Sequence, residues 1–321
     1  MTNPKIVCLD GASIYPVNDS HWEAFKRAGN FIIYERTAPD EITARCADAE
    51  IVLTNKVPFN KATIQSLPKL RYIGVLATGF NIIDIQAAKD AGITVTNIPA
   101  YSTESVAQHT IALLFAITNR VEDYSAAVAG GKWCKCPDFT FRHREWRELA
   151  GKRFGIVGFG NIGKAVAGIA KALGMSVALY TSKEQNELPD GFEKMELDEL
   201  FQKCDVVSLH CPLNEHTRHI ADARRLALMK NDAILLNTAR GPLVDEDALA
   251  AALKNSRIYA AGLDVLSNEP PKADCPLIGV SNCFITPHIA WASTEARDRL
   301  FDIALDNVQC FINGNSKNVI N

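Results

Sequence analysis

Phe154-Gly-Ile-Val-Gly-Phe-Gly-Asn-Ile-Gly163 is a short β-type run that leads directly into a glycine-rich loop. Apolar residues then recur at helical spacing from Ile162 to Leu173, so the loop is predicted to open a helix. Glycines in this pattern allow a tight turn and let the backbone approach a pyrophosphate at the helix N-terminus. The alternative is a plain glycine-rich turn, but the strand before it and the helix after it favour a dinucleotide site.

The residues after the next β-type run bear on the choice between NAD and NADP. A dinucleotide site usually places an acidic residue about 20 positions beyond the glycine loop, where it binds the ribose 2′-hydroxyl. Here that place reads Tyr180-Thr181-Ser182-Lys183. Hydroxyl and ammonium groups could accept a 2′-phosphate that a carboxylate would repel, so the sequence favours NADP or relaxed selectivity. The alternative is that Lys183 is an ordinary surface lysine.

Both parts of the chain alternate β-type runs with stretches of helical length, which predicts βαβ units and parallel sheets. In the first hundred residues the runs are 6–9, 31–34, 51–54, 72–76 and 93–96. After the middle of the chain they are 154–158, 177–180, 206–210, 233–237, 259–265 and 284–286. We therefore expect an α/β protein with two doubly wound parallel-sheet domains.

Two longer helices are expected outside this rhythm. The first starts near Ser102, where Ser105 and Gln108 have capping-box spacing, and runs as a bridge between the domains to the glycine pair at 130–131. The second starts at residue 293 or 294, is amphipathic, and ends at the Asn-Gly pair at 313–314.

Composition restricts the classes of partner. The 321 residues fit about two domains, and 34 basic against 37 acidic residues give a net charge of -3 without a basic run. We therefore expect no nucleic-acid partner. The N-terminus does not read as a signal peptide, and the most apolar segment, 111–117, is too short to span a bilayer. The nine scattered cysteines lack C-x-x-C spacing, so we expect reduced thiols, a cytoplasmic protein and no metal site.

Three charged residues in the last quarter of the chain suit a catalytic site: Arg240, Glu269 and His288. An arginine can hold a substrate carboxylate, a histidine can move a proton near neutral pH, and a glutamate can orient that histidine and favour its protonated form. Each follows a predicted strand, so the carboxyl ends of parallel strands bring them to one rim. Residues 77–79 end a strand of the first domain in the same sense, and we expect two sheets to face each other across one cleft.

Each member of the trio has a plainer explanation when it is taken alone. Arg240 could form an ion pair at a helix end, Glu269 could be an exposed turn residue, and His288 could be structural. We interpret His109 and His210 as structural histidines. The shared placement of the trio after a dinucleotide loop favours the catalytic interpretation.

At this point the chain resembles the D-isomer-specific 2-hydroxyacid dehydrogenases over essentially its whole length. The matching segments are L-A-T-G-F-N-I-I-D (76–84), S-V-A-Q-H-T (105–110), G-F-G-N-I-G (158–163), L-H-C-P-L (209–213), N-T-A-R-G (237–241), L-D-V (263–265), N-E-P-P (268–271) and T-P-H-I-A-W (286–291). The 105–110 segment and the A-T-G-F-N loop look most like the glycerate dehydrogenase, or hydroxypyruvate reductase, branch.

The resemblance implies a bilobed enzyme acting on a small 2-keto or 2-hydroxy acid. A flavodoxin-like substrate domain, residues 1–101 plus 293–321, would close on a Rossmann cofactor domain, residues 102–292. A homodimer built mainly through the cofactor domains is usual. The resemblance also implies His288 as the acid/base, Glu269 as its partner and Arg240 as the substrate anchor. Backbone N–H groups of Ala77, Thr78 and Gly79 would help bind the substrate carboxylate.

The cofactor implied by the resemblance is NAD or NADP, because Thr181 replaces the usual acid. Its expected contacts lie on loops of the cofactor domain, at Thr110, Gly158, Gly160, Asn161, Ile162, Gly163, Thr181, Ser182, Lys183, Cys211, Pro212, Thr217, Thr238, Ala239 and Asp264.

Alternatives to this function are of three kinds. Enzymes of the same family act on glyoxylate, lactate-like or bulkier 2-keto acids, or 3-phosphoglycerate. A dinucleotide-sensing protein could keep this fold and work by binding partners, as some transcriptional corepressors resembling the family do. A hydrolase or metalloenzyme could use His210, Cys211, His216 and His219, but Pro212 and the preceding strand end favour a cofactor-side loop there.

Overall fold

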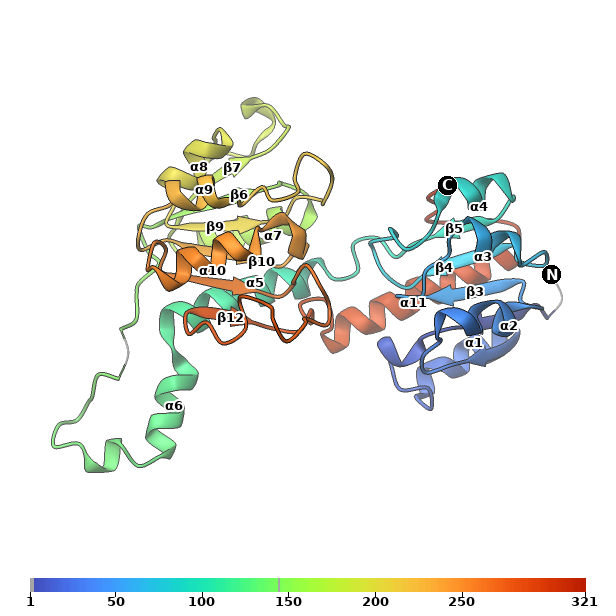
Figure 1. Ribbon diagram of the computed structural model, residues 1–321, viewed down its shortest axis with the longest axis horizontal. Coiled ribbons are helices and arrows are strands. Elements are labelled where there is room, and N and C mark those ends of the chain that lie inside the picture. The colour runs from blue at the N-terminus through green and yellow to red at the C-terminus, as the bar shows by residue number, and fades with distance from the viewer. Residues whose placement is uncertain (1–2, 144) are drawn as a thin grey trace. The chain divides into compact units, whose positions relative to one another are not determined.

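The computed structural model of the chain describes residues 3–143 and 145–321 (Figure 1). It divides into two compact units. The first comprises Met1–Ser102 with Ser293–Asn321, and the second comprises Thr103–Ala292. Each unit is built on one parallel sheet flanked by helices, which confirms the predicted fold class.

The first unit has a five-stranded parallel sheet in the order β2-β1-β3-β4-β5. Its strands are β1 (Lys5–Cys8), β2 (Asn30–Ile33), β3 (Ile51–Thr54), β4 (Tyr72–Val75) and β5 (Thr94–Thr96). Its helices are α1 (Glu23–Ala28), α2 (Ile42–Cys46), α3 (Lys61–Gln65), α4 (Ile85–Asp90) and α11 (Thr294–Ile312). The strand order reverses between β1 and β3, as in flavodoxin-like sheets.

The last helix, α11, returns the end of the chain to the first unit. Ser293 caps it by accepting a hydrogen bond from the Ala296 N–H at 3.1 Å, and Asn313 is its C-cap residue. Phe301 on α11 packs edge-on against Trp22 and Phe25. The predicted start and end of this helix are confirmed.

The second unit has a seven-stranded parallel sheet in the order β12-β11-β10-β9-β6-β7-β8. Its strands are β6 (Arg153–Val157), β7 (Ser176–Tyr180), β8 (Phe192–Lys194), β9 (Val206–Leu209), β10 (Ile234–Asn237), β11 (Ala260–Leu263) and β12 (Cys283–Ile285). Its helices are α5 (Thr103–Asn119), α6 (Val121–Ala129), α7 (Asn161–Ala172), α8 (Leu197–Lys203), α9 (Ala223–Leu228) and α10 (Glu246–Lys254). The order reverses between β6 and β9.

Two apolar clusters form the core of the second unit, one on each face of the sheet. On one face α5 and α7 pack against β6, β7, β10 and β11. On the other face α8, α9 and α10 pack together over the sheet. The strands are therefore buried on both sides, as parallel strands usually are.

The predicted helix between the domains is wrong in two respects. It is interrupted at Arg120, which has a left-handed backbone conformation with a φ of 55°. The Thr118 carbonyl accepts a hydrogen bond from the Arg147 N–H at 3.0 Å, so a tertiary contact ends α5 where local sequence would continue it. The predicted capping box is also wrong, because α5 begins at Thr103 and Ser105 therefore lies inside the helix; the Ser105 hydroxyl donates to the Ala290 carbonyl at 2.6 Å.

The short strand β8 was not predicted. Its three residues, Phe-Glu-Lys, lack an apolar pattern, and pairing with β7 defines the strand. Among the helices of the described residues, none is long and apolar enough to cross a membrane.

Candidate active site

The carboxyl ends of β6 and β9 meet at the point where the strand order of the second unit reverses. Ligands of open α/β sheets bind at such a switch point. The glycine loop follows β6, and the 210–217 loop follows β9. The structure therefore brings the two loops that were predicted to bind the cofactor to the same edge of the sheet.

The three glycines of the loop have three different surroundings. Gly158 has a φ of 99°, and a Cβ there would lie 2.6 Å from the Cys211 backbone nitrogen. A Cβ on Gly163 would lie 2.1 Å from the Gly158 carbonyl oxygen, because α7 packs directly on the loop. A Cβ on Gly160 would meet nothing within 4 Å. The open side of the loop at Gly160 and the first N–H groups of α7 thus fit a pyrophosphate.

The residues after β7 place hydroxyls and an ammonium where a carboxylate is usual. Thr181 and Lys183 are half-buried and Ser182 is exposed. The Thr181 hydroxyl oxygen accepts a hydrogen bond from the Lys183 N–H at 3.3 Å, which closes a small turn. The side chains of this turn suit a 2′-phosphate better than an acid would.

The 210–217 loop combines a buried start with an exposed turn. Burial lowers the pKa of His210 to about 4, and its Nε2 lies 2.8 Å from the Ser208 hydroxyl. Burial also raises the pKa of the Cys211 thiol to about 11, so this thiol stays protonated. Thr217 folds the exposed part by donating to the Pro212 carbonyl at 2.7 Å. The geometry supports the interpretation of His210 as a structural residue.

Thr110 and Thr238 form a buried link between α5 and the end of β10. Their hydroxyl oxygens are 2.8 Å apart, and the Thr110 hydroxyl also donates to the Val106 carbonyl. Thr110 is fully buried. In this arrangement Thr110 holds Thr238 in place at the strand end, next to Ala239.

The turn that carries Arg240 is fixed from two sides. The Asn237 side chain donates to the Arg240 carbonyl at 2.8 Å and accepts from the Ala239 N–H at 3.0 Å. Gly241 lies so close to the segment after β11 that a Cβ would be 2.0 Å from the carbonyl carbon of Leu266. The Arg240 side chain is exposed on this fixed turn.

Glu269 and His288 form a hydrogen-bonded pair. His288 Nδ1 lies 2.6 Å from Glu269 Oε2, and both side chains are about one-third exposed, at 28% and 35%. The other carboxylate oxygen, Oε1, accepts from the Leu266 N–H at 3.0 Å. Glu269 is therefore held by the same segment against which the Arg240 turn packs. With Nδ1 engaged, the imidazole presents Nε2 for proton transfer.

Asp264 is buried, with a side chain only 1% exposed, and fastens the loop that carries His288. Its Oδ1 accepts from the Ile289 N–H at 2.9 Å and from the Thr286 hydroxyl at 2.6 Å. Its Oδ2 accepts from the Ala290 N–H at 2.8 Å. The family resemblance implied a cofactor contact at Asp264, but nothing in the sequence indicated these bonds.

Ala77, Thr78 and Gly79 lie in the first unit, in the loop after β4. The Ala77 carbonyl accepts from the Ile98 N–H at 3.0 Å, and the Thr78 carbonyl accepts from Asn97 Nδ2 at 2.8 Å. In a trans peptide the N–H points opposite to the carbonyl. The N–H groups of Thr78 and Gly79 therefore point away from residues 97–98 and suit an anion.

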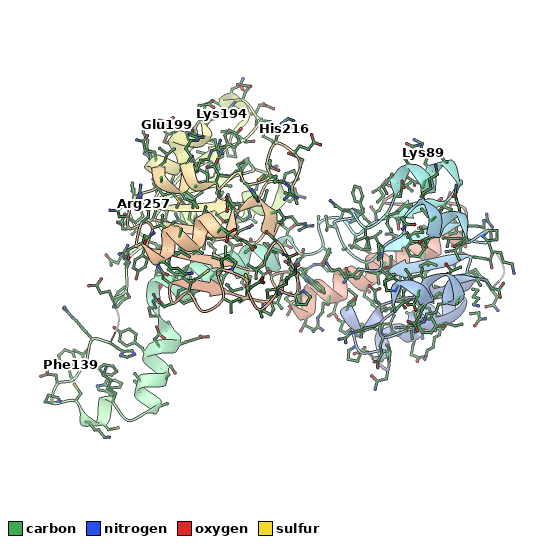
Figure 2. The ribbon with its side chains drawn as sticks, in the orientation of Figure 1. Lys89, Phe139, Lys194, Glu199, His216 and Arg257 are labelled. Carbon is green, nitrogen blue, oxygen red and sulfur yellow. The ribbon has the colours of Figure 1, made fainter. Side chains whose placement is uncertain are left out.

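Within the described residues, no group of three or more His, Cys, Asp or Glu side chains could hold a metal ion. His216 lies exposed on the loop after β9 (Figure 2), and His219 is exposed as well. All nine cysteines are free thiols.

Comparison with known proteins decides the family. The family model of the NAD-binding domain of D-isomer-specific 2-hydroxyacid dehydrogenases matches residues 111–290. The chain belongs to this family. Members of the D-2-hydroxyacid dehydrogenase family are NAD(P)-dependent oxidoreductases, and the predicted resemblance and enzyme class are confirmed.

Full-length relatives agree with this assignment. The chain is 45% identical to a hydroxypyruvate reductase from Blautia hydrogenotrophica, over 99% of each chain. It is 40% identical to a glycerate dehydrogenase from Methylorubrum extorquens, over 98% of each chain. Among solved structures, an NADPH-dependent glyoxylate/hydroxypyruvate reductase from Sinorhizobium meliloti, in complex with NADP and malonate, is similar with a TM-score of 0.86. It shares 27% identity over 99% of this chain and 97% of that chain.

Proposed function

We propose that this D-2-hydroxyacid dehydrogenase reduces hydroxypyruvate to D-glycerate, and catalyses the reverse oxidation, with His288 as the acid/base. The observation that carries the proposal is the 2.6 Å contact between His288 and Glu269 beside the fixed turn of Arg240. The names of the relatives that are 45% and 40% identical support the choice of substrate.

In the proposed mechanism a bound nicotinamide supplies the hydride to C2 of the keto acid. Protonated His288 delivers a proton from Nε2 to the C2 oxygen, so the C=O bond becomes H–C–OH. Glu269 accepts from Nδ1, which holds the imidazole in one orientation and leaves Nε2 for the transfer. Arg240 binds the carboxylate or the keto oxygen, and its permanent charge polarises the carbonyl. We propose in addition that the N–H groups of the 77–79 loop of the first unit serve as donors to an anionic group.

We also propose that the enzyme accepts NADPH. The turn at 181–183 offers two hydroxyls and an ammonium, and the structure from Sinorhizobium meliloti holds NADP. A ribose 2′-phosphate would accept hydrogen bonds there.

We further propose a homodimer built through residues 121–143 and 145–146 of the second unit, here called the arm. No residue of α6 is buried, and Phe139 is 90% exposed near the end of the arm (Figure 2). The arm also exposes Val121, Val128, Trp133 and Trp146. Apolar side chains gathered on one projection favour contact with a second copy, and the family is expected to pair through this unit.

Steady-state kinetics of variants test the proposed roles. His288→Ala should lower kcat for hydroxypyruvate by about 100-fold or more, because general acid catalysis contributes that much, with a small change in KM. Arg240→Ala should lower kcat and also raise KM for the keto acid. Arg240→Lys should recover part of the loss, since lysine keeps the positive charge but lacks the paired N–H donors of the guanidinium group. The control is His216→Ala, an exposed histidine. Wild-type kcat in His288→Ala would remove His288 from the acid/base role.

A further inference from the structure

The loop that carries His288 has a conformation that must be held from outside. His288 has a left-handed backbone conformation with a φ of 55°, which residues other than glycine rarely adopt. Its N–H donates to the Asp264 carbonyl at 2.8 Å. Such strain persists only where the surroundings fix it.

Two residues of α5, one turn apart, reach the two ends of this loop. The Ser105 hydroxyl donates to the Ala290 carbonyl at 2.6 Å, after His288. His109 Nε2 lies 2.9 Å from the Thr286 hydroxyl, before His288. Residues four apart share one face of a helix. One face of α5 is thus joined to both sides of the loop.

The direction of the hydrogen bond between His109 and Thr286 follows from the number of protons that the Thr286 hydroxyl can donate. The Thr286 hydroxyl has one proton, and it donates this proton to Asp264 Oδ1 at 2.6 Å. Its oxygen must then accept from His109 Nε2, so His109 carries hydrogen on that nitrogen. The bonds run in one direction, from His109 through Thr286 to Asp264.

This series of hydrogen bonds affects the loop because it ends at Asp264. Its carboxylate is buried and holds the N–H groups of Ile289 and Ala290, immediately after His288. A buried carboxylate is stable only while its donors stay in place. His109 Nε2 lies 3.5 Å from Asp264 Oδ1, close enough to stabilise that charge as well.

We propose that His109 and Ser105 are positioning residues for His288, with Thr286 as the link that transmits the orientation of His109 to the loop. His109 was interpreted from sequence as a structural histidine, and the contacts give it a function in catalysis without contact to the reacting atoms. The inference rests on the proposed acid/base role of His288. In this proposal the serine and the histidine of the 105–110 segment hold the two ends of the loop that carries His288.

Matched variants separate the effect of losing a hydrogen bond from the effect of losing side-chain packing. His109→Leu and Thr286→Val remove a polar group at similar volume and should lower kcat by about tenfold, with KM for coenzyme changed less than about twofold. His109→Gln keeps a donor near the position of Nε2, and Thr286→Ser keeps the hydroxyl, so both should retain most of kcat. If the conservative variants lost as much as the apolar ones, the proposal would be wrong. Ser105→Ala, a smaller change, should lower kcat several-fold.

A double-mutant cycle tests the link itself. If His109 acts through Thr286, the variant with both His109→Leu and Thr286→Val should be no slower than the slower single variant. Losses of kcat that multiply would show independent effects and would contradict the link.

Amide hydrogen exchange gives a readout that does not depend on the substrate. The N–H groups of Ile289 and Ala290 should exchange faster in His109→Leu than in the wild type or His109→Gln. Unchanged exchange would overturn the proposal whatever happens to kcat, and faster exchange with unchanged kcat would overturn the positioning role. Full activity of His288→Ala, measured alongside, would instead identify a failure of the proposed function.

Discussion

Gly160 and Gly163 belong to one loop, yet their surroundings predict opposite effects of the same substitution. Gly163→Ala would place a methyl group 2.1 Å from the Gly158 carbonyl oxygen. Overpacking of this kind costs about 1–3 kcal/mol, so Tm should fall by several degrees. Gly160→Ala meets no protein atom within 4 Å and should change stability by less than about 0.5 kcal/mol.

The same pair tests the cofactor site. A methyl group on Gly160 would occupy the space where a pyrophosphate approaches the backbone, so KM for the coenzyme should rise about tenfold or more. Thermal unfolding and steady-state kinetics on both variants are the measurements. A coenzyme KM that is unchanged in Gly160→Ala would place the pyrophosphate elsewhere.

For single residues, the sequence predicted the catalytic side chains better than the hydrogen bonds that hold them in place. The charge types of Arg240, Glu269 and His288 and their places after strands were enough to propose a site. The bonds of Asp264 to the loop and the reach of Ser105 to Ala290 depend on which strands are neighbours. That information is long-range, and local patterns misread Ser105 as a helix cap.

The arm that begins with α6 is an element whose shape is kept by its own contacts. The Tyr124 and Phe141 rings are 6.0 Å apart, and Trp133 Nε1 donates to the Phe139 carbonyl at 3.1 Å. Its remaining apolar surface faces outward. This combination of internal order and exposed apolar groups suits an interface with a second copy.

Charges on the arm should therefore prevent dimerisation. We expect the wild type to sediment at twice the chain mass of 35.1 kDa. The variant with Phe139→Glu and Trp146→Glu should sediment as a monomer, because burying two carboxylates at an apolar interface is costly. Ile278→Glu, at a residue that is 52% exposed outside the arm, is the control and should stay dimeric. A double variant that remains dimeric would exclude the arm as the interface.

At the scale of elements, predictability followed the strength of the local signal. Ser293 and the Asn-Gly pair at 313–314 mark α11 because capping is local chemistry. The break at Arg120 depends on a hydrogen bond from Arg147, 29 positions beyond Thr118, and could not be read locally. β8 exists because β7 offers an edge to pair with, since its own residues have weak strand character.

At the scale of the whole molecule, the rhythm of strands and helices was enough to predict two parallel sheets. It could not give the neighbours of each strand, because a crossover can add the next strand on either side. The observed orders place a switch point between β1 and β3 and another between β6 and β9. The second point gathers the glycine loop and the 210–217 loop, while the trio follows β10, β11 and β12 at the same edge.

One steady-state experiment tests the proposed substrate, coenzyme and catalytic residues together. Purified enzyme is assayed with hydroxypyruvate, glyoxylate, pyruvate and phosphohydroxypyruvate, each with NADH and with NADPH. The proposed function predicts the highest kcat/KM for hydroxypyruvate, and the turn at 181–183 predicts substantial turnover with NADPH. Strong preference for NADH would remove only the phosphate-binding role of that turn. Preference for glyoxylate or another acid would contradict the proposed substrate, and no turnover with any keto acid would contradict the catalytic role of Arg240, Glu269 and His288.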